Sequence, residues 1–305
     1  MGQMTAVIST VLIISSIVFG VNSSSPYAAD SEESEGVFSA YDFSSGEDAA
    51  AEEANLPEDA QILVDNEDLL IAATDWDPED LWGCTLDVYL KNKTDRKLGF
   101  LINNACINGL MMDPFYQTAL EPGEAVNGEV EWFQSDFDEA DIKDVTDIEL
   151  EWVVYDYDDW AADFLLEEKF HIYPYGEDAA VPYVRKARDT DRVLVDNEEC
   201  TIIATGSEKD ELWGFRLHLY IINKSSSHSI TVAIDDAYIN GESCFPYWAT
   251  MIYPDRAACE AITWSNSLLE ESGIETVKSL ELPIVIMDSE DFSKKPVSET
   301  VTYEP

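Results

Sequence analysis

The sequence predicts an all-β protein with two tandem immunoglobulin-like β-sandwich domains, each containing one short helix, after a disordered N-terminal segment. Three observations predict this fold class: a long internal repeat, short stretches in which apolar and polar residues alternate, and frequent turn residues between those stretches. Alternation with a period of two marks a strand that buries one face. Many short strands with little helix are typical of a sandwich.

The repeat sets the domain boundaries. Residues 62–67 (ILVDNE) recur as 193–198 (VLVDNE), and Leu-Trp-Gly at 81–83 recurs at 212–214, in both cases 131 residues later. Solenoid units repeat every ~20–50 residues, so a period of this length indicates duplication of a whole domain. The sequence therefore predicts repeat 1 over residues 61–174, a linker over 175–192 and repeat 2 over 193–305.

The first strands of repeat 1 are expected to form a hairpin. Apolar and polar residues alternate over 84–90, a polar turn follows, and a second alternating stretch runs from 98 to 106. Two such stretches joined by a turn are the usual signature of a β-hairpin. Further strands are expected over 148–154 and 164–173.

Turns and helices have their own signals. Asn-Gly at 108–109 and at 240–241 is the strongest signal for a two-residue turn, because both positions need a positive φ. One short helix is expected over 135–142, with Ser135 as its N-cap, and one over 265–274 in the second repeat.

The N-terminus carries an export signal. Residues 5–21 form an apolar run of about 17 residues followed by small residues, as in a secretory signal peptide. An uncleaved anchor is the alternative, since this length is near the lower limit for a spanning helix. We assign residues 1–29 to a signal peptide or N-terminal anchor, and 30–60 to a disordered acidic stalk. Both features indicate an extracellular or cell-envelope location.

The charge balance limits the class of partner. Sixty-three acidic against 17 basic residues give the 305-residue chain a net charge of −46. Nucleic acids and anionic bilayers are bound through Lys and Arg, so we expect no nucleic acid and no membrane contact beyond an N-terminal anchor. A protein or a carbohydrate at the cell surface remains the expected partner.

Several short motifs carry a resemblance to a known group of domains. They are Val-Asp-Asn-Glu at 64–67, Tyr-Leu-Lys-Asn-Lys-Thr at 89–94, Ile-Asn-Gly at 107–109, Asp-Pro at 113–114 and Glu-Pro-Gly at 121–123. In these motifs the chain resembles uncharacterised immunoglobulin-like domains of exported proteins from Gram-positive anaerobic bacteria. The resemblance covers both repeats, although the second has Asp255 where the first has Gly123. It implies the sandwich fold and export, and no activity.

Five cysteines follow no zinc-binding spacing. In a hairpin centred on Asp95, Cys84 and Cys106 lie opposite each other, so a disulfide between them is one interpretation for an exported protein. The other is that both pack as small apolar residues.

Two acidic groups are candidates for a Ca²⁺ site, because carboxylates at alternating positions of a loop suit a hard cation. They are Asp156, Asp158 and Asp159 in repeat 1, and Asp288, Glu290 and Asp291 at the matching place in repeat 2. A further acidic loop at 75–80 lacks the Gly and Glu positions of a calcium loop. Solvated acidic loops are the alternative in so acidic a chain. No other cofactor is expected.

Aromatic residues beside polar loops are candidates for a binding edge that recognises protein or carbohydrate. They are Trp76, Phe115, Tyr116, Tyr247 and Trp248. The aromatic residues that match between the repeats are expected to pack in the core or between strands. They are Trp82 with Trp213, Trp132 with Trp264, and Trp160 with Phe292.

Catalytic patterns are scarce. The sequence has three histidines, no Gly-x-Ser-x-Gly motif and no glycine-rich phosphate loop, so we expect no enzyme. The expected function is a non-enzymatic, exported cell-surface binding or spacer module built from a duplicated β-sandwich. The alternative is a calcium-binding or accessory domain pair of a surface enzyme or adhesin.

Overall fold

The computed structural model describes residues 56–80, 83–114, 116–159, 161–234, 236–291, 293–294 and 297–305, with the backbone of 49–50. These residues are mostly β-strand, with one short α-helix in each half of the chain, α2 (Gln134–Ala140) and α3 (Asn266–Glu271). The all-β class is confirmed. The predicted signal peptide or anchor at 1–29 lies outside the described residues, as does most of the predicted stalk at 30–60.

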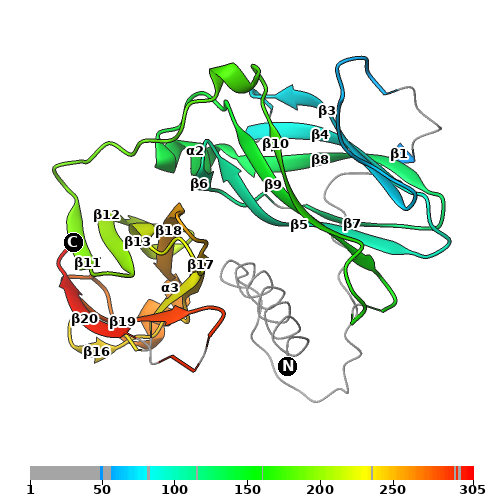
Figure 1. Cartoon of the computed structure of the whole chain (residues 1–305). Coiled ribbons are helices and arrows are strands. Elements are labelled where there is room, and N and C mark those ends of the chain that lie inside the picture. The colour runs from blue at the N-terminus through cyan, green and yellow to red at the C-terminus, as the bar shows by residue number, and fades with distance from the viewer. Residues whose placement is uncertain are drawn as a thin grey trace. The chain divides into compact units, whose positions relative to one another are not determined.

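The chain divides into two compact units between Val184 and Arg185. We call them domain 1 and domain 2. Domain 1 has two antiparallel sheets (Figure 1). The β4 sheet has the order β2-β3-β4-β8 with β1 along β8, and the β5 sheet has the order β10-β9-β5, with β6 and β7 also along β5. The strands are β1 (Ala49–Ala50), β2 (Gln61–Asp65), β3 (Leu69–Asp77), β4 (Gly83–Asn92), β5 (Leu98–Ile107), β6 (Leu110–Met111), β7 (Gln117–Leu120), β8 (Ala125–Phe133), β9 (Ile148–Asp156) and β10 (Leu166–Ile172).

Domain 2 repeats this topology. Its β13 sheet pairs β11, β12, β13 and β18 in that order, and its β14 sheet is built on β19, which pairs β14, β15 and β20, while β17 pairs β14 and β16 pairs β15. The strand β5 of domain 1 corresponds to two shorter strands, β14 and β15. The strands are β11 (Arg192–Asp196), β12 (Cys200–Asp210), β13 (Gly214–Asn223), β14 (Ile230–Ile234), β15 (Tyr238–Ile239), β16 (Glu242–Ser243), β17 (Ala249–Ile252), β18 (Ala257–Trp264), β19 (Leu280–Asp288) and β20 (Val297–Tyr303).

The predicted hairpin of residues 84–106 is wrong. β4 pairs with β3 and β8, whereas β5 pairs with β9 and β7, so the polar turn between β4 and β5 carries the chain from one sheet to the other. The predicted Cys84–Cys106 bridge fails with it: the two residues lie on strands of different sheets, and both are buried thiols. Both strands alternate because each turns one face to the shared core, and alternation does not say which strands are neighbours.

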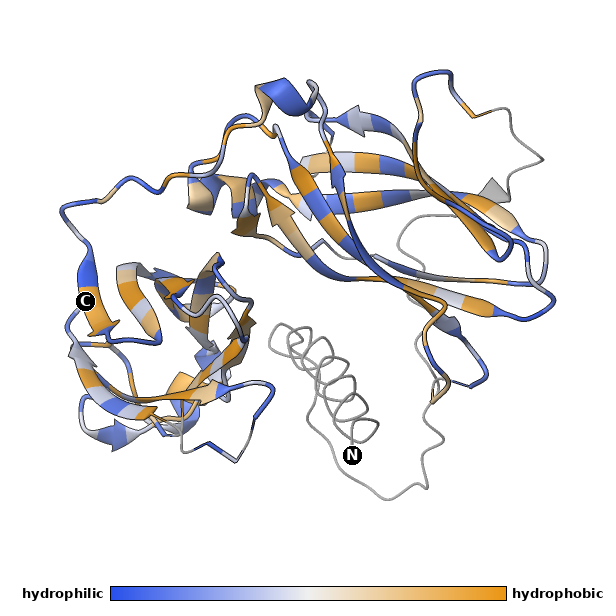
Figure 2. Cartoon of the chain, in the orientation of Figure 1, coloured by the Kyte–Doolittle hydropathy of each residue, from blue (hydrophilic) through white to orange (hydrophobic). Residues whose placement is uncertain are grey.

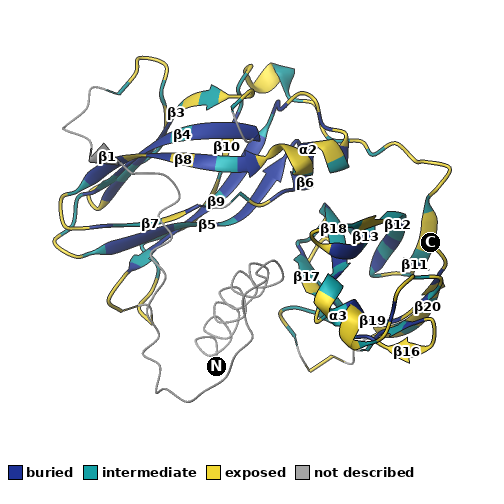
Figure 3. Cartoon of the chain, turned by 180° about the vertical axis from the view of Figure 1, so that it is seen from behind, coloured by how far each residue is buried: buried dark blue, intermediate teal, exposed yellow. Residues whose placement is uncertain are grey.

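The core fills the space between the sheets of each domain. Apolar residues alternate with polar ones along the strands (Figure 2), and the inward residues are buried (Figure 3). Trp132 and Trp264 are among the largest fully buried side chains, and each indole donates to a carbonyl, of Met112 at 2.8 Å and of Cys244 at 2.9 Å. Burying one large apolar side chain contributes about 1.5–3 kcal/mol. Their placement in the core is confirmed.

One buried asparagine closes the same corner in each domain. In domain 1 the Asn92 amide nitrogen donates to the carbonyls of Arg96 at 2.7 Å and Leu120 at 3.0 Å, and its oxygen accepts from Thr94 N–H at 2.9 Å. This side chain therefore ties the chain between β4 and β5 to the end of β7. Asn223 makes the corresponding bonds in domain 2, to the carbonyls of His228 and Ile252 and from Ser225 N–H.

The repeated Val-Asp-Asn-Glu motif belongs to the same corner. Asn66 Oδ1 accepts from the amides of Asp68 and Leu69 at 2.9 Å, which shapes the β2–β3 turn, and Lys93 Nζ pairs with Asp65 at 2.5 Å. In domain 2, Asn197 shapes the turn and Lys224 pairs with Asp196 at 2.5 Å. A motif that repeats at the distance of one domain is therefore explained by folding alone.

The Asn-Gly turns form as predicted. Asn108 and Asn240 both have a φ of 54°, and the glycine after each has a φ of 86°. Asn108 Oδ1 also accepts from Thr146 N–H at 2.8 Å, which ties the turn to the chain that enters β9.

The helix caps differ between the domains. The Ser265 hydroxyl accepts from Leu268 N–H at the start of α3. In α2 the N-cap is Phe133, which offers no side-chain bond, so the prediction of Ser135 as the cap is wrong. Ser135 lies inside the first turn.

The predicted linker at 175–192 is divided between the two domains. Its first part contains a 3-10 helix, η1 (Glu177–Ala179), and is bonded to domain 1 through Tyr183 N–H, which donates to the Asn108 carbonyl at 2.7 Å. Its second part belongs to domain 2, where Arg185 forms a two-pronged pair with Asp191 and lies 5.1 Å from the centre of the Tyr220 ring. At the N-terminal side, Leu56 packs with Tyr89, so domain 1 begins before residue 61.

We expect Asn92→Ala to lower the stability of domain 1, and Asn223→Ala that of domain 2, each by about 3 kcal/mol. The reason is that several buried backbone groups lose their partner at once. Calorimetry of the full chain, in which each variant should displace only one of two unfolding transitions, measures this loss. The control is Asn127→Ala on the exposed side of β8; losses no larger than in this control would contradict the corner's role.

Candidate binding site

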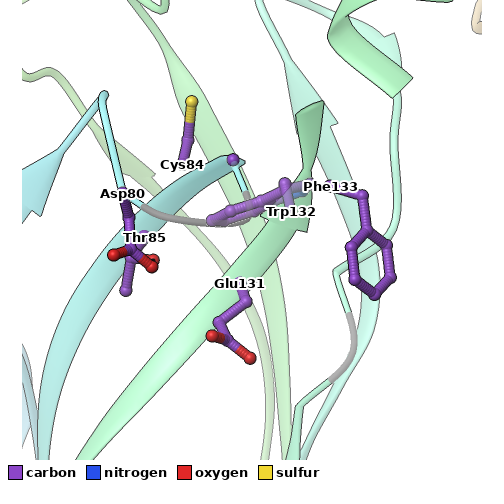
Figure 4. A pocket seen from close by; sticks show the side chains of 7 residues that line it. Asp80, Cys84, Thr85, Glu131, Trp132 and Phe133 are labelled. Atoms are coloured by element: carbon purple, nitrogen blue, oxygen red, sulfur yellow. The ribbon is translucent and has the colours of Figure 1, made fainter. Parts of the chain in front are cut away.

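A pocket opens in domain 1 where β4 begins and β8 ends (Figure 4). It holds about 170 Å³. The side chains of Asp80, Thr85 and Glu131 lie on one side of the sheet and that of Cys84 on the other, as strand alternation requires (Figure 4). The lining residues are Asp80, Gly83, Cys84, Thr85, Glu131, Trp132 and Phe133.

Local constraints hold the pocket in shape. A Cβ atom on Gly83 would lie 2.0 Å from the Trp132 carbonyl oxygen, so only glycine allows β4 to start this close to β8. The Thr85 hydroxyl donates to Asp80 Oδ2 at 3.1 Å, and the Cys84 thiol donates to the Pro78 carbonyl at 3.5 Å. These two bonds tie the loop after β3 to the first residues of β4.

Carboxylates line up across the outer face of the β4 sheet. Asp75 on β3, Asp87 on β4 and Glu129 on β8 lie directly opposite one another. The neighbouring row contains Asp77, Thr85 and Glu131. Like charges opposite each other destabilise a sheet, so folding alone does not favour this arrangement.

The electrostatic environment reflects this crowding. Burial, followed by the nearby charges of Glu129 and Asp75, raises the pKa of Asp87. Burial and then the charges of Glu129 and Asp80 raise the pKa of Glu131. Both groups would be stabilised in their charged form by a cation placed at this face.

Domain 2 has a different set of charges at the same six positions. Its rows are Gly206, His218 and Ala261, and Glu208, Arg216 and Thr263. Arg216 Nη1 lies 3.5 Å from Glu208 Oε1, and His218 Nε2 lies 3.3 Å from the same oxygen. Domain 2 thus provides its own guanidinium at the place of Thr85, whereas domain 1 has five carboxylates and no basic residue in these rows.

The predicted aromatic binding edge does not form as one surface. Tyr116 is only 5% exposed and packs edge-to-face on Trp152, so its assignment to a binding edge is wrong. Trp76 is half-buried against Trp132. Trp248 is half-buried, Tyr247 is highly exposed, and Phe115 lies outside the described residues. The prediction counted polar neighbours in the sequence, which do not decide where a ring points.

The carboxylates predicted to bind Ca²⁺ have other partners. Asp156 pairs with Arg96 at 2.8 Å and accepts from Asp158 N–H at 3.1 Å. In domain 2, Asp288 pairs with Lys294 and accepts from the amides of Glu290 and Asp291 at 2.9 and 3.0 Å. Each aspartate therefore organises its own turn, and the Asp159 N–H donates to the Asp156 carbonyl at 3.2 Å. Within the described parts of the chain, no three His, Cys, Asp or Glu side chains are gathered as metal ligands.

Two of the five cysteines have thiols with a raised pKa. Burial raises the pKa of Cys84 to about 11 and that of Cys200 to about 12, which suits packed rather than reactive thiols. Over the described ranges, no helix combines the length and apolar character needed to cross a bilayer.

Sequence reasoning missed Asp87, Glu129 and Glu131. A signal was present: each is acidic in the first repeat and basic or uncharged at the matching position of the second, where His218, Ala261 and Thr263 stand. Recognising it required knowing that the three strands are neighbours.

We expect the two domains to respond in opposite directions to acidification. A carboxyl whose folded-state pKa is raised, as in Asp87 and Glu131, destabilises the fold at neutral pH, and that destabilisation is relieved as pH falls through the raised pKa. A lowered pKa has the opposite effect, because stability present above the unfolded value of about 4 is lost as pH falls below it. In domain 2 the pKa is lowered for five carboxyls: Asp191, Asp196, Asp210, Asp288 and Asp291.

Calorimetry between pH 7 and about pH 3.5 tests this, since the transition of domain 1 should rise relative to that of domain 2 over the carboxyl range. Asp87→Asn should raise the stability of domain 1 at pH 7 by about 0.5–1 kcal/mol and weaken its pH dependence. Parallel shifts of both transitions, or no gain from Asp87→Asn, would contradict the electrostatic account.

Comparisons with known proteins assign no family. No protein-family model and no curated protein matches the chain. Among solved structures, the YadV chaperone matches 77% of this chain and 100% of its own, at 12% identity and a TM-score of 0.20. The exo-chitosanase CsxA of Amycolatopsis orientalis matches 78% of this chain and 26% of the enzyme, at 12% identity and 0.22. The Salmonella enterica SafA pilin with the SafB chaperone matches 72% and 89%, at 9% identity and 0.19. TM-scores this low carry no argument about function.

Proposed function

We propose that the protein is a non-enzymatic, exported module that binds a partner protein by taking a cationic side chain into the acidic pocket of domain 1. The observation that carries this proposal is the exchange of Thr85 for Arg216 between the domains. In domain 2 the guanidinium at this position approaches Glu208. In domain 1 the two rows contain carboxylates and no guanidinium. A cation from a partner would therefore occupy the position that Arg216 fills in domain 2.

The dimensions of the pocket favour a single side chain. Its volume of about 170 Å³ lies below the ~300–1,000 Å³ of ordinary small-molecule sites. Arginine suits it because a planar guanidinium pairs with carboxylates in two-pronged geometry and stacks on aromatic rings. Binding of such a group would lower the pKa of Asp87 and Glu131 and so be accompanied by proton release.

Phe133 adds an apolar contact at the rim. It is 60% exposed although it occupies the N-cap of α2, where domain 2 has the capping residue Ser265. A serine there is worth about 1 kcal/mol more than a residue that cannot cap. An exposed phenylalanine in place of a cap is explained if its ring contacts the partner, for example by stacking on the guanidinium.

Export is supported by the apolar run at residues 5–21. A purely spacing role is the outcome if the pocket binds nothing.

We expect Thr85→Arg to weaken binding of an oligoarginine peptide at least about tenfold, because the new guanidinium pairs with the carboxylates that the peptide needs. Calorimetric titration of the full chain at low salt measures the affinity, with a thermal melt to show that the variant is folded. The matched control is Thr263→Arg, which adds the same charge to the corresponding face of domain 2. Equal effects of both variants would show unspecific attraction, and no binding to the unmodified chain would exclude the proposed function.

A second variant separates binding from stability. We expect Phe133→Ser to raise the stability of domain 1 by about 1 kcal/mol, since it copies the cap of α3, and to weaken peptide binding several-fold through loss of the aromatic contact. Melting temperature and affinity are measured on the same sample. A variant that gains stability and keeps full affinity would show that Phe133 takes no part in binding.

A further inference from the structure

Exposed apolar side chains gather at one end of domain 2. Leu212 is 83% exposed, Trp213 43% and Tyr247 87%. With Phe245, whose ring centre lies 4.4 Å from that of Tyr247, we call these residues the apolar tip. The prediction that Trp213 lies in the core is wrong.

The fold brings both parts of the tip to the same place. Leu212 and Trp213 immediately precede β13, whose residue Phe215 pairs with Trp264 at the end of β18. A Cβ atom on Gly214 would lie 2.2 Å from the Trp264 carbonyl oxygen. On the other side, the Trp264 indole donates to the Cys244 carbonyl at 2.9 Å, next to Phe245. The two loops therefore flank one buried tryptophan.

The backbone holds the tip residues outward. Asp210 Oδ1 accepts from the amides of Leu212 and Trp213, both at 2.7 Å, and so fixes the turn that presents them. Tyr247 has a φ of 48°, a left-handed conformation that costs a non-glycine residue about 1 kcal/mol or more. A strained and exposed tyrosine is not explained by the stability of the domain.

The duplication gives independent support. Leu-Trp-Gly is retained in both repeats, and an aromatic residue stands at both Phe115 and Tyr247. Close packing on Trp264 accounts for the retention of Gly214. It does not account for Leu212, which is 83% exposed, or for the exposed part of Trp213.

We propose that the apolar tip inserts into an apolar pocket with a basic rim on a partner protein. Trp and Tyr are the residues that most often dominate such contacts. Exposed acidic residues lie on the segments next to the tip: Glu211 precedes Leu212, Glu242 lies two residues before Cys244, and Glu270 and Glu271 end α3. They match a basic rim, and the net charge of −46 opposes binding to anionic bilayers and to a second copy of the chain. An aliphatic leucine that is 83% exposed suits a protein pocket better than a sugar ring. This surface is distinct from the pocket of domain 1, and neither proposal depends on the other.

The test uses two synthetic peptides of equal charge, one alternating leucine with lysine and one alternating serine with lysine. Leu212→Ser combined with Trp213→Ser should weaken binding of the leucine–lysine peptide at least about fivefold and leave that of the serine–lysine peptide within about twofold, because only the former offers apolar contacts. The control variant is Val193→Ser, which removes an apolar side chain that is 62% exposed on β11. Thr85→Arg should weaken binding of the serine–lysine peptide and keep the preference for the leucine–lysine peptide, so failure of the two proposals is distinguishable.

Other outcomes overturn the proposal. Equal losses in the tip variant and in Val193→Ser would show that the tip is an ordinary exposed surface. The same holds if Trp213 fluorescence, read as the difference between the unmodified chain and Trp213→Phe, is unchanged by saturating leucine–lysine peptide. Tip-dependent binding to phosphatidylglycerol vesicles or chito-oligosaccharides, or tip-dependent self-association in sedimentation, would assign the tip to a different occupant.

Discussion

The structure of each domain depends on one buried amide at the point where the chain passes between the sheets. Asn92 and Asn223 are almost fully buried, and the amide nitrogen of each donates to carbonyls at this crossing. Without that side chain, the crossing would bury unpaired backbone groups at the edge of the core. The neighbouring Lys93 and Lys224 then attach the turn before β3 or β12 to the same corner. A small set of polar contacts thus determines which sheet the following strand joins.

Because the domain is duplicated, each feature of domain 1 can be compared with the corresponding feature of domain 2. Features that recur, such as the buried asparagine, the Asn-Gly turn and the indole bond of Trp132 and Trp264, are explained by contacts inside a domain. Features that differ separate the roles of the two copies: the carboxylate rows and Phe133 belong to domain 1, and Arg216 belongs to domain 2. The Leu-Trp pair recurs in the sequence of both repeats, and in domain 2 Leu212 is 83% and Trp213 43% exposed.

The fold class, the Asn-Gly turns and the buried Trp132 and Trp264 could be predicted from the sequence, because each depends on local pattern or on burial of a large apolar side chain. The β4–β5 hairpin could not, since alternation reports which face is buried and not which strand lies alongside. Tyr116 was misplaced for a related reason: polar neighbours in the sequence coexist with a ring that packs on Trp152. The acidic rows depend on the register of three strands that are far apart in the sequence, such as Asp87 opposite Glu129.

The divided linker has a mechanical consequence. Tyr183 is bonded to domain 1 and Arg185 to domain 2, so one residue, Val184, separates the two anchored positions in the chain. A pulling force applied across the two domains would reach both sandwiches without first straightening a loose tether. If the Arg185–Asp191 pair opened before the sheets did, residues 185–191 could extend to a span of at most about 2 nm, at ~3.4 Å per residue. That short segment would act as an extensible element in series with two stiff ones.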